Sequence, residues 1–284
     1  MNARARIAFA LALACSSSCA PLVDEGSRCS TSESHISCTF HTDDVWTGVA
    51  NAHPRRVHWE VPLGTPPEDG WPVVVFFQGS FWRAEWTFAG RALEPFGSYH
   101  QAETVRDLLD AGYAVLAPET KLRGFSFWDS NVVGFSVFYE LAEDDFFFRS
   151  VLDEIERDRF GPLDERNLFV TGVSSGGYMA SRVAVTYPDR VRAAAIVSAS
   201  YAWCWGHVCE PGAIDDDHPP TLFVHGGRDL VVPASTMQVY ADALESAGIA
   251  QRAVIDDDVG HGWIPASSVE VLAWFTAAID DGSD

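Results

Sequence analysis

Buried strands and amphipathic helices alternate along this chain from about residue 56 to its end, and this alternation restricts its fold more than any other feature. Continuous apolar runs such as WPVVVFFQG (71–79) are typical of strands that are covered on both faces. YHQAETVRDLLDAG (99–112) has helical spacing and ends on a glycine, a common helix stop. The alternation predicts an α/β fold with a mostly parallel central sheet and helices on both faces. Such sheets carry their active sites at the carboxyl ends of the strands.

The remaining elements follow from the same patterns. The predicted strands cover residues 57–63, 113–119, 167–173, 193–200, 221–227 and 252–257, of which we expect the last three to be buried. The predicted helices cover residues 144–160, 177–188, 233–248 and 268–280. Only about 20 residues separate the strands at 193–200 and 221–227, which leaves no room for a large cap domain. A longer insertion at 121–143 is expected to form one wall of a site or a partial lid.

The first 20 residues predict an export signal. Arg4 and Arg6 precede a short apolar run at 7–14, which is much shorter than the ~20 residues that span a bilayer. Two processing routes stay open, lipidation of Cys15 at the cell surface or cleavage near Ala20 with release from the cell. We therefore divide the chain into an export segment at 1–20, a tether and edge segment at 21–50, and an α/β catalytic domain at 51–284.

Export to an oxidising compartment makes disulfides the expected state of the cysteines. The spacing suggests the pairs Cys29–Cys38 and Cys204–Cys209, with free buried thiols as the alternative. The six cysteines show no zinc-binding pattern, since neither short-spaced pair has the usual histidines beside it. We expect no metal and no other cofactor.

The charge balance excludes two classes of partner. The chain has 40 Asp and Glu against 19 Lys and Arg, a formal net charge of −21. Nucleic acids and anionic lipids both require clustered cations, so neither fits this surface. No partner protein is indicated either.

The segment TGVSSGGYMA (171–180) contains G-x-S-x-G, with Ser174 in the central position. It follows a predicted strand directly and precedes a predicted helix, which is the context of a nucleophile elbow. Ser174 is therefore the candidate nucleophile, and Ser175 would offer its backbone N–H to an oxyanion.

A serine nucleophile needs a base that a carboxylate orients, and in α/β-hydrolases the order along the chain is Ser, acid, His. Asp229 follows the strand at 221–227, and His261 follows the strand at 252–257. The competing acids Asp256, Asp257 and Asp258 lie one strand too late, and His207 and His218 precede Asp229. We expect His225, in the same strand-end loop as Asp229, to be structural and to bond the backbone there.

The oxyanion hole needs a second donor, usually from the loop after an early strand. Gln78, Gly79 and Ser80 occupy that place, where many hydrolases have His-Gly-x. The N–H of Ser80 is the candidate, and the side-chain amide of Gln78 is expected to bond the loop in place of the histidine.

Aromatic residues concentrate near these strand ends, and this concentration predicts an apolar acyl-binding groove or an adsorbing patch. The candidates for substrate contact are Phe81, Trp82, Trp128, Trp203, Trp205 and Trp263. Ordinary packing under loops is the alternative for any one of them.

The run VSSGGYMASR around Ser174, with its spacing to RDLVVP and GHGW, resembles extracellular medium-chain-length polyhydroxyalkanoate depolymerases. The resemblance covers most of the chain after about residue 40. It implies an α/β-hydrolase fold without a separate substrate-binding domain, a triad of Ser174, Asp229 and His261, and a hydrophobic polyester as substrate.

Three alternatives remain beside this secreted serine ester hydrolase. One is a secreted esterase for aryl, feruloyl or small acyl esters. A peptidase is disfavoured because no charged pocket signature for a peptide is present. The third is a non-catalytic surface-binding module on the same fold, which the complete triad argues against.

The triad assignment predicts that Ser174→Ala and His261→Ala each lower the rate of ester hydrolysis by at least ~10³-fold. Steady-state hydrolysis of a p-nitrophenyl ester measures this. Retained activity in either variant would show that the triad is assigned to the wrong residues.

Overall fold

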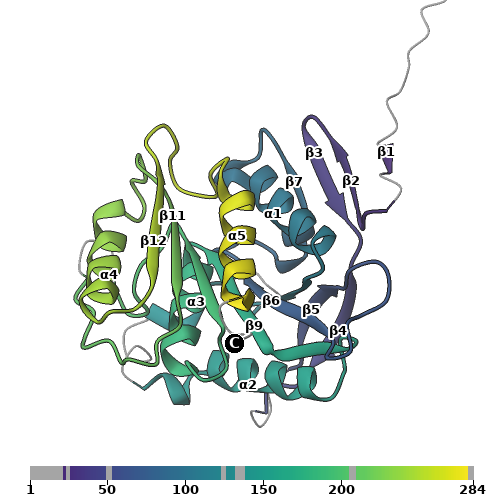
Figure 1. Cartoon of the computed structure of the whole chain (residues 1–284), viewed down its shortest axis with the longest axis horizontal. Coiled ribbons are helices and arrows are strands. Elements are labelled where there is room, and N and C mark those ends of the chain that lie inside the picture. Colours follow the sequence, from purple (N-terminus) through teal and green to yellow (C-terminus); the bar gives the residue numbers. More distant parts are fainter. Residues whose placement is uncertain are drawn as a thin grey trace, which may run out of the picture.

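The computed structural model of the chain describes residues 22–23, 26–48, 53–122, 126–131, 138–204 and 209–280. Within them, eight strands form one central sheet (Figure 1). In sheet order these strands are β12 (Gln251–Asp256), β11 (Thr221–Gly226), β10 (Ala193–Val197), β9 (Leu163–Val173), β6 (Trp71–Phe77), β8 (Ala114–Pro118), β5 (Arg55–Glu60) and β4 (His41–Val45). The strands from β12 to β8 run parallel, whereas β5 and β4 are antiparallel to their neighbours. The predicted α/β fold is thereby confirmed.

Helices cover both faces of this sheet. They are α1 (Ser98–Asp110), α2 (Glu143–Glu156), α3 (Ser175–Thr186), α4 (Ala234–Ser246) and α5 (Ser267–Asp280), with short 3₁₀ turns η1 (Ala84–Phe88), η2 (Pro95–Gly97), η3 (Asp129–Asn131) and η4 (Tyr139–Leu141). α1 and α5 share one core with alternate residues of the strands, and α2 and α3 share the core on the opposite face (Figure 1). α4 packs beside α3 against β10 and β11.

The apolar run of β6 shows why these strands lack alternation in the sequence. Val74 and Phe76 face α1 and α5, while Val73, Val75 and Phe77 face α2 and α3. Because both faces are covered, every residue from 73 to 77 is fully buried.

The strand expected at 252–257 differs from the prediction in its burial. β12 is the edge strand of the sheet, and its residues are exposed or half-buried rather than buried. Its apolar residues are few, so composition there already differs from that of β6. The parallel pairing with β11 is as the alternation predicts.

The segment expected as a tether supplies three of the four strands of a second, small sheet. Its strands are β1 (Leu22–Val23), β2 (Cys29–Ser32), β3 (His35–Cys38) and β7 (Ala89–Arg91). The polar composition of this stretch hid the hairpin of β2 and β3, because only Ile36 and the two cysteines are buried in the core. Among the described residues, no domain is inserted over the sheet, and no helix has the length and apolar character that crossing a bilayer requires.

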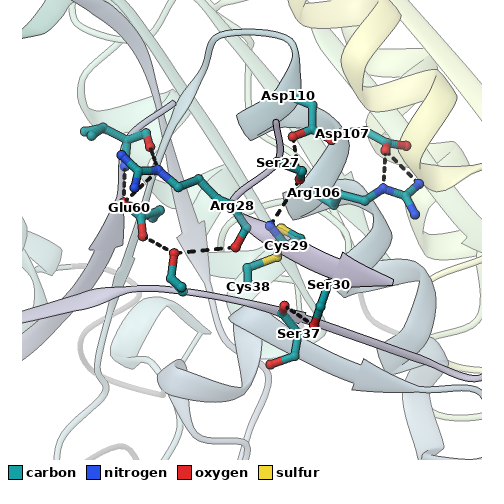
Figure 2. Close-up of a disulfide and its surroundings, with 12 residues drawn as sticks. Ser27, Arg28, Cys29, Ser30, Ser37, Cys38, Glu60, Arg106, Asp107 and Asp110 are labelled. Atoms are coloured by element: carbon teal, nitrogen blue, oxygen red, sulfur yellow. Dashed lines mark hydrogen bonds and ion pairs between the residues drawn. A yellow bond between two sulfur atoms is a disulfide. The ribbon is translucent and has the colours of Figure 1, made fainter. Parts of the chain in front are cut away.

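Disulfides join Cys29 to Cys38 and Cys204 to Cys209. Figure 2 shows the first of these across the β2–β3 hairpin. Ser27 Oγ donates to Asp110 Oδ1 at 2.7 Å, which ties the hairpin to the end of α1. Arg28 Nε donates to the Val61 carbonyl at 3.0 Å, which ties it to the end of β5 (Figure 2).

We predict that the double variant Cys29→Ser, Cys38→Ser is less stable by about 2–3 kcal/mol, because the disulfide restricts a loop in the unfolded chain. Thermal unfolding should then begin several degrees lower, by roughly 2–4 °C for each kcal/mol in a chain of this size. The matched variant Cys204→Ser, Cys209→Ser, which opens a shorter loop, should cost less. An unchanged midpoint in the first variant would mean that packing alone holds the hairpin.

Candidate active site

Ser174 lies at the sharp turn between β9 and α3. Its backbone has φ 56° and ψ −123°, which is strained for a residue with a side chain. Two hydrogen bonds hold the turn, from the Ser174 N–H to the Val197 carbonyl and from the Tyr178 N–H to the Ser174 carbonyl, both at 3.0 Å. The strained turn points the Ser174 side chain into a cavity above the sheet.

The glycines of the motif are needed because backbones touch at this turn. A Cβ on Gly176 would lie 2.0 Å from the Phe77 carbonyl oxygen, and one on Gly172 would lie 2.6 Å from the backbone of Gly176. A side chain at either position would push α3 away from the ends of β6 and β9. The spacing G-x-S-x-G is therefore a packing requirement of the elbow.

The two adjacent serines have different environments. Ser175 is buried, and its hydroxyl accepts a hydrogen bond from the Trp128 N–H at 3.0 Å. Ser174 instead lines the cavity. Ser174 is thus the serine whose hydroxyl a substrate can reach.

Asp229 and His261 are brought together from loops after neighbouring strands, β11 and β12. His261 Nδ1 lies 2.7 Å from Asp229 Oδ2, and the other carboxylate oxygen accepts the N–H groups of Val231 and Val232, both at 2.8 Å. An ionised Asp229 assigns the ring proton to Nδ1, which leaves the lone pair of Nε2 for another group.

Asp229 is held in its charged form although it is buried. Burial raises the pKa of its carboxyl, but hydrogen bonds from the neighbouring histidines and a backbone amide outweigh burial and hold that pKa well below its usual range. His225 is one of those neighbours, with Nε2 at 3.5 Å from Asp229 Oδ2. The same nitrogen donates to the Val232 carbonyl at 2.9 Å, so the backbone-bonding role expected for His225 is confirmed.

Two of the competing residues have other partners. Asp258 pairs with Arg228 at the surface, and His218 is buried against Tyr240, at 2.7 Å from its hydroxyl. His207 lies outside the described residues.

Ser174 and His261 line a single cavity of about 250 Å³. The other lining residues are Gly79, Ser80, Phe81, Trp82, Pro95, Phe96, Ser98, Gln101, Val173 and Val231. No hydrogen bond joins Ser174 Oγ to His261 among the contacts of the described residues. Such contacts are often longer without substrate and shorten when it binds.

The loop after β6 forms one wall of the cavity. The side-chain amide of Gln78 donates to the Trp82 carbonyl and, at 3.1 Å, to the Thr120 hydroxyl, so the expected bond to the loop is confirmed. The N–H of Phe81 donates to the Ser126 carbonyl at 2.9 Å. Within the described residues, the N–H of Ser80 has no such partner and Ser80 lines the cavity, which keeps it as the candidate oxyanion donor with the N–H of Ser175.

Two predicted substrate contacts are corrected by the structure. Trp128 and Trp263 are each 1% exposed and belong to the core. Trp263 stacks on Phe76, and Trp128 packs edge-on against Phe77. Both therefore support the site from beneath and do not face a substrate.

The other aromatic candidates divide into two groups. Phe81 and Trp82 line the cavity, as predicted. Trp203 does not line the cavity. Its ring lies against the guanidinium of Arg182, whose Cζ is 4.8 Å from the ring centroid. Trp205, like Cys15 and the export segment at 1–20, lies outside the described residues.

Sequence reasoning missed one wall of the cavity, which is formed by η2 and the start of α1. Phe96, Ser98 and Gln101 lie there, some 75 residues before Ser174 in the chain. The sequence feature that could have indicated these residues is the apolar PFG turn before a helix, but such turns are also typical of ordinary packing.

Among the described residues, one group has ligands close enough for a metal: His58, Glu85 and Glu119. Arginines already neutralise its carboxylates, since Arg56 bonds Glu119 at 2.6 Å and Arg83 bonds Glu85 at 2.9 Å. A divalent cation would have to displace these partners, so the group fits an ion-pair network better than a metal site.

Residues 60–272 match the dienelactone hydrolase family. The chain belongs to this family. It is 42% identical over 243 residues to a poly(3-hydroxyoctanoate) depolymerase of Pseudomonas fluorescens, which covers 85% of this chain and 86% of that protein. The resemblance to polyhydroxyalkanoate depolymerases is thereby confirmed.

Solved structures agree on the fold. A dienelactone hydrolase-like promiscuous phosphotriesterase from metagenomic libraries is 16% identical with a TM-score of 0.58, covering 87% of this chain and 98% of its own. A thermostable esterase is 19% identical with a TM-score of 0.54, covering 85% of this chain but 61% of that chain.

We predict that Asp229→Asn lowers kcat for ester hydrolysis by roughly 10³–10⁴-fold, because an amide favours the wrong tautomer of His261. The matched variant Asp258→Asn, which alters a surface ion pair near the same loop, should keep its activity. Equal losses in the two variants would contradict the role of Asp229.

Proposed function

We propose that this chain is a serine ester hydrolase that degrades polyhydroxyalkanoate polyester through an acyl-enzyme. The observation that carries the proposal is that Ser174 and the Asp229-bonded His261 share one apolar cavity. The name of the Pseudomonas relative supports the substrate class.

In the proposed mechanism, His261 Nε2 takes the proton of Ser174 Oγ as the oxygen attacks an ester carbonyl carbon. Asp229 stabilises the imidazolium that forms. The N–H groups of Ser80 and Ser175 bind the oxyanion of the tetrahedral intermediate. His261 then returns the proton to the departing alcohol, and the acyl group stays on Ser174.

Deacylation repeats these steps with water as the nucleophile. His261 removes a proton from water, whose oxygen attacks the acyl carbon and expels Ser174. The free hydroxyacid leaves, and the proton returns to Ser174 Oγ. The low pKa of Asp229 supports this cycle, because the carboxylate stays charged whenever His261 is protonated.

The size of the cavity favours an acyl group of medium length. Its 250 Å³ lies near the lower end of the ~300–1,000 Å³ range of ligand pockets, which suits one acyl group rather than several polymer units. A longer polymer must therefore extend over the rim. We take this fit as support for a medium-chain-length preference.

The rim is suited to an insoluble, apolar substrate. Phe81, Phe96 and Val231 line the cavity, yet they are 57%, 47% and 62% exposed. Leu230, next to Val231, is 93% exposed, and Phe127 packs edge-on against Phe81. Apolar side chains grouped in this way at a cavity mouth are typical of surfaces that bind other apolar matter.

Export and the division of the chain belong to the same proposal. The export segment at 1–20, the edge segment at 21–50 and the catalytic domain at 51–284 suit an enzyme that meets its polymer outside the cell. The disulfides fit an oxidising compartment. Anchoring through Cys15 and free release remain the two routes for the mature chain.

One competing function is the hydrolysis of small soluble esters, which the same cavity could hold. Such an enzyme would need the triad and the cavity but not the exposed rim. A non-catalytic binding module would need the rim alone, and failure to react with an organophosphonate serine probe would support it.

We expect the purified mature chain to clear emulsions of poly(3-hydroxyoctanoate) but not of poly(3-hydroxybutyrate), because the longer side chain fills the cavity. Loss of turbidity measures this, with Ser174→Ala as the inactive control. Cleavage of p-nitrophenyl esters with neither emulsion cleared would instead identify a small-ester hydrolase.

A further inference from the structure

Two residues with polar side chains, Ser98 and Gln101, line the cavity but have no part in the proposed triad or oxyanion hole. Gln101, in the first turns of α1, lines the cavity and is 3% exposed. Its surroundings in the cavity are mainly apolar and aromatic. A polar group placed in such surroundings fixes the orientation and identity of a ligand more often than it adds affinity.

The hydrogen bonds of Gln101 settle which end of its amide is available. Nε2 donates to the Trp86 carbonyl at 3.2 Å, so the nitrogen is the atom that faces η1. Among the described residues, none donates to Oε1, and this oxygen is not sealed from the cavity. Gln101 thus presents an unpaired acceptor to whatever occupies the cavity.

The neighbouring polar side chain is not comparable. Ser98, one turn earlier, also lines the cavity, but its hydroxyl donates to Glu94 Oε2 at 2.8 Å and accepts the Arg91 N–H at 3.2 Å. Its hydrogen-bonding capacity is used within the protein. Gln101 therefore keeps an acceptor for the substrate that Ser98 lacks.

We infer that Gln101 selects acyl groups that carry a free hydroxyl, by accepting a hydrogen bond from that hydroxyl at Oε1. The inference rests on the proposed function and adds a specificity residue to it. A plain fatty acyl chain in the same cavity would displace water from Oε1 and leave it unpaired, which costs binding energy. A hydroxyacyl chain restores the bond.

This selectivity has a consequence for the polymer. Inside a polyester chain the hydroxyl oxygen of each unit is esterified and carries no hydrogen, so it cannot donate to Oε1. The unit at the hydroxyl end of the chain has a free hydroxyl. Gln101 therefore favours the ester bond next to that end, and the acyl-enzyme formed there is a single hydroxyacyl unit.

The test compares two soluble substrates, p-nitrophenyl 3-hydroxyoctanoate and p-nitrophenyl octanoate, by their kcat/KM values. Wild type should prefer the hydroxy ester, and Gln101→Met, which keeps the length of the side chain, should reduce that preference by roughly two- to tenfold. Hydrolysis of the plain octanoate should become faster in this variant, because its acyl chain then leaves no acceptor unpaired.

A matched control is Thr104→Val, which removes a buried polar group from the same helix without altering the cavity lining. Its substrate preference should equal that of wild type. An equal preference in wild type and Gln101→Met would overturn the inference while leaving the proposed function intact. Hydrolysis of neither ester by wild type would instead contradict the proposed function.

A measurement on wild type alone covers the case in which Gln101→Met does not fold. Free 3-hydroxyoctanoate should inhibit the hydrolysis of p-nitrophenyl octanoate more strongly than octanoate does. Equal inhibition by the two acids would overturn the assignment of Oε1 as a hydroxyl acceptor.

Discussion

The proposed chemistry depends on direct backbone contact between the start of α3 and the ends of β6 and β9. Gly176 lies so close to the Phe77 carbonyl that any side chain there would separate the helix from the sheet. The same contact forces the backbone of Ser174 into a strained conformation, which the hydrogen bond to Val197 stabilises. The covered strands are rigid enough to hold this strain because side chains pack against both of their faces. Packing in the core thus offsets the strain of the turn, and the Ser174 hydroxyl remains accessible from the cavity.

Trp128 shows how the surrounding loops are fixed to that turn. Its N–H donates to Ser175 Oγ and its indole N–H to the Gln78 carbonyl, both at 3.0 Å, so one residue joins α3 to the loop after β6. The next residue, Asp129, bonds through its N–H to Asp144, which in turn pairs with the buried Arg55 at 2.7 Å. Charged groups this deeply buried are stable only in mutual contact, so the network specifies one position for the loop.

The alternation of strands and helices allowed the sheet, its helices and the elbow to be predicted, because each depends on local patterns. The pairing of Asp229 with His261 followed from the order of motifs along the strand ends. The wall formed by Phe96 and Gln101 could not be predicted in this way, because these residues reach the cavity only through tertiary packing of η2 and α1. The prediction that Trp128 contacts the substrate was wrong for a related reason. The sequence shows that an aromatic residue is near the site, but not on which side of the loop it packs.

The cavity and the rim would recognise different features of a substrate, one acyl group in the cavity and an apolar surface at the rim. In the proposed function the cavity holds one acyl group and offers it the Gln101 acceptor, so it would distinguish one unit from another. The exposed apolar residues around it have no such directional groups and can distinguish only an apolar surface from water. In the proposed function, weak, non-directional contact at the rim would let a polymer chain slide until an ester reaches Ser174. Stronger contact there would hold the polymer in place and slow the next cleavage, which is why selectivity is better placed inside the cavity.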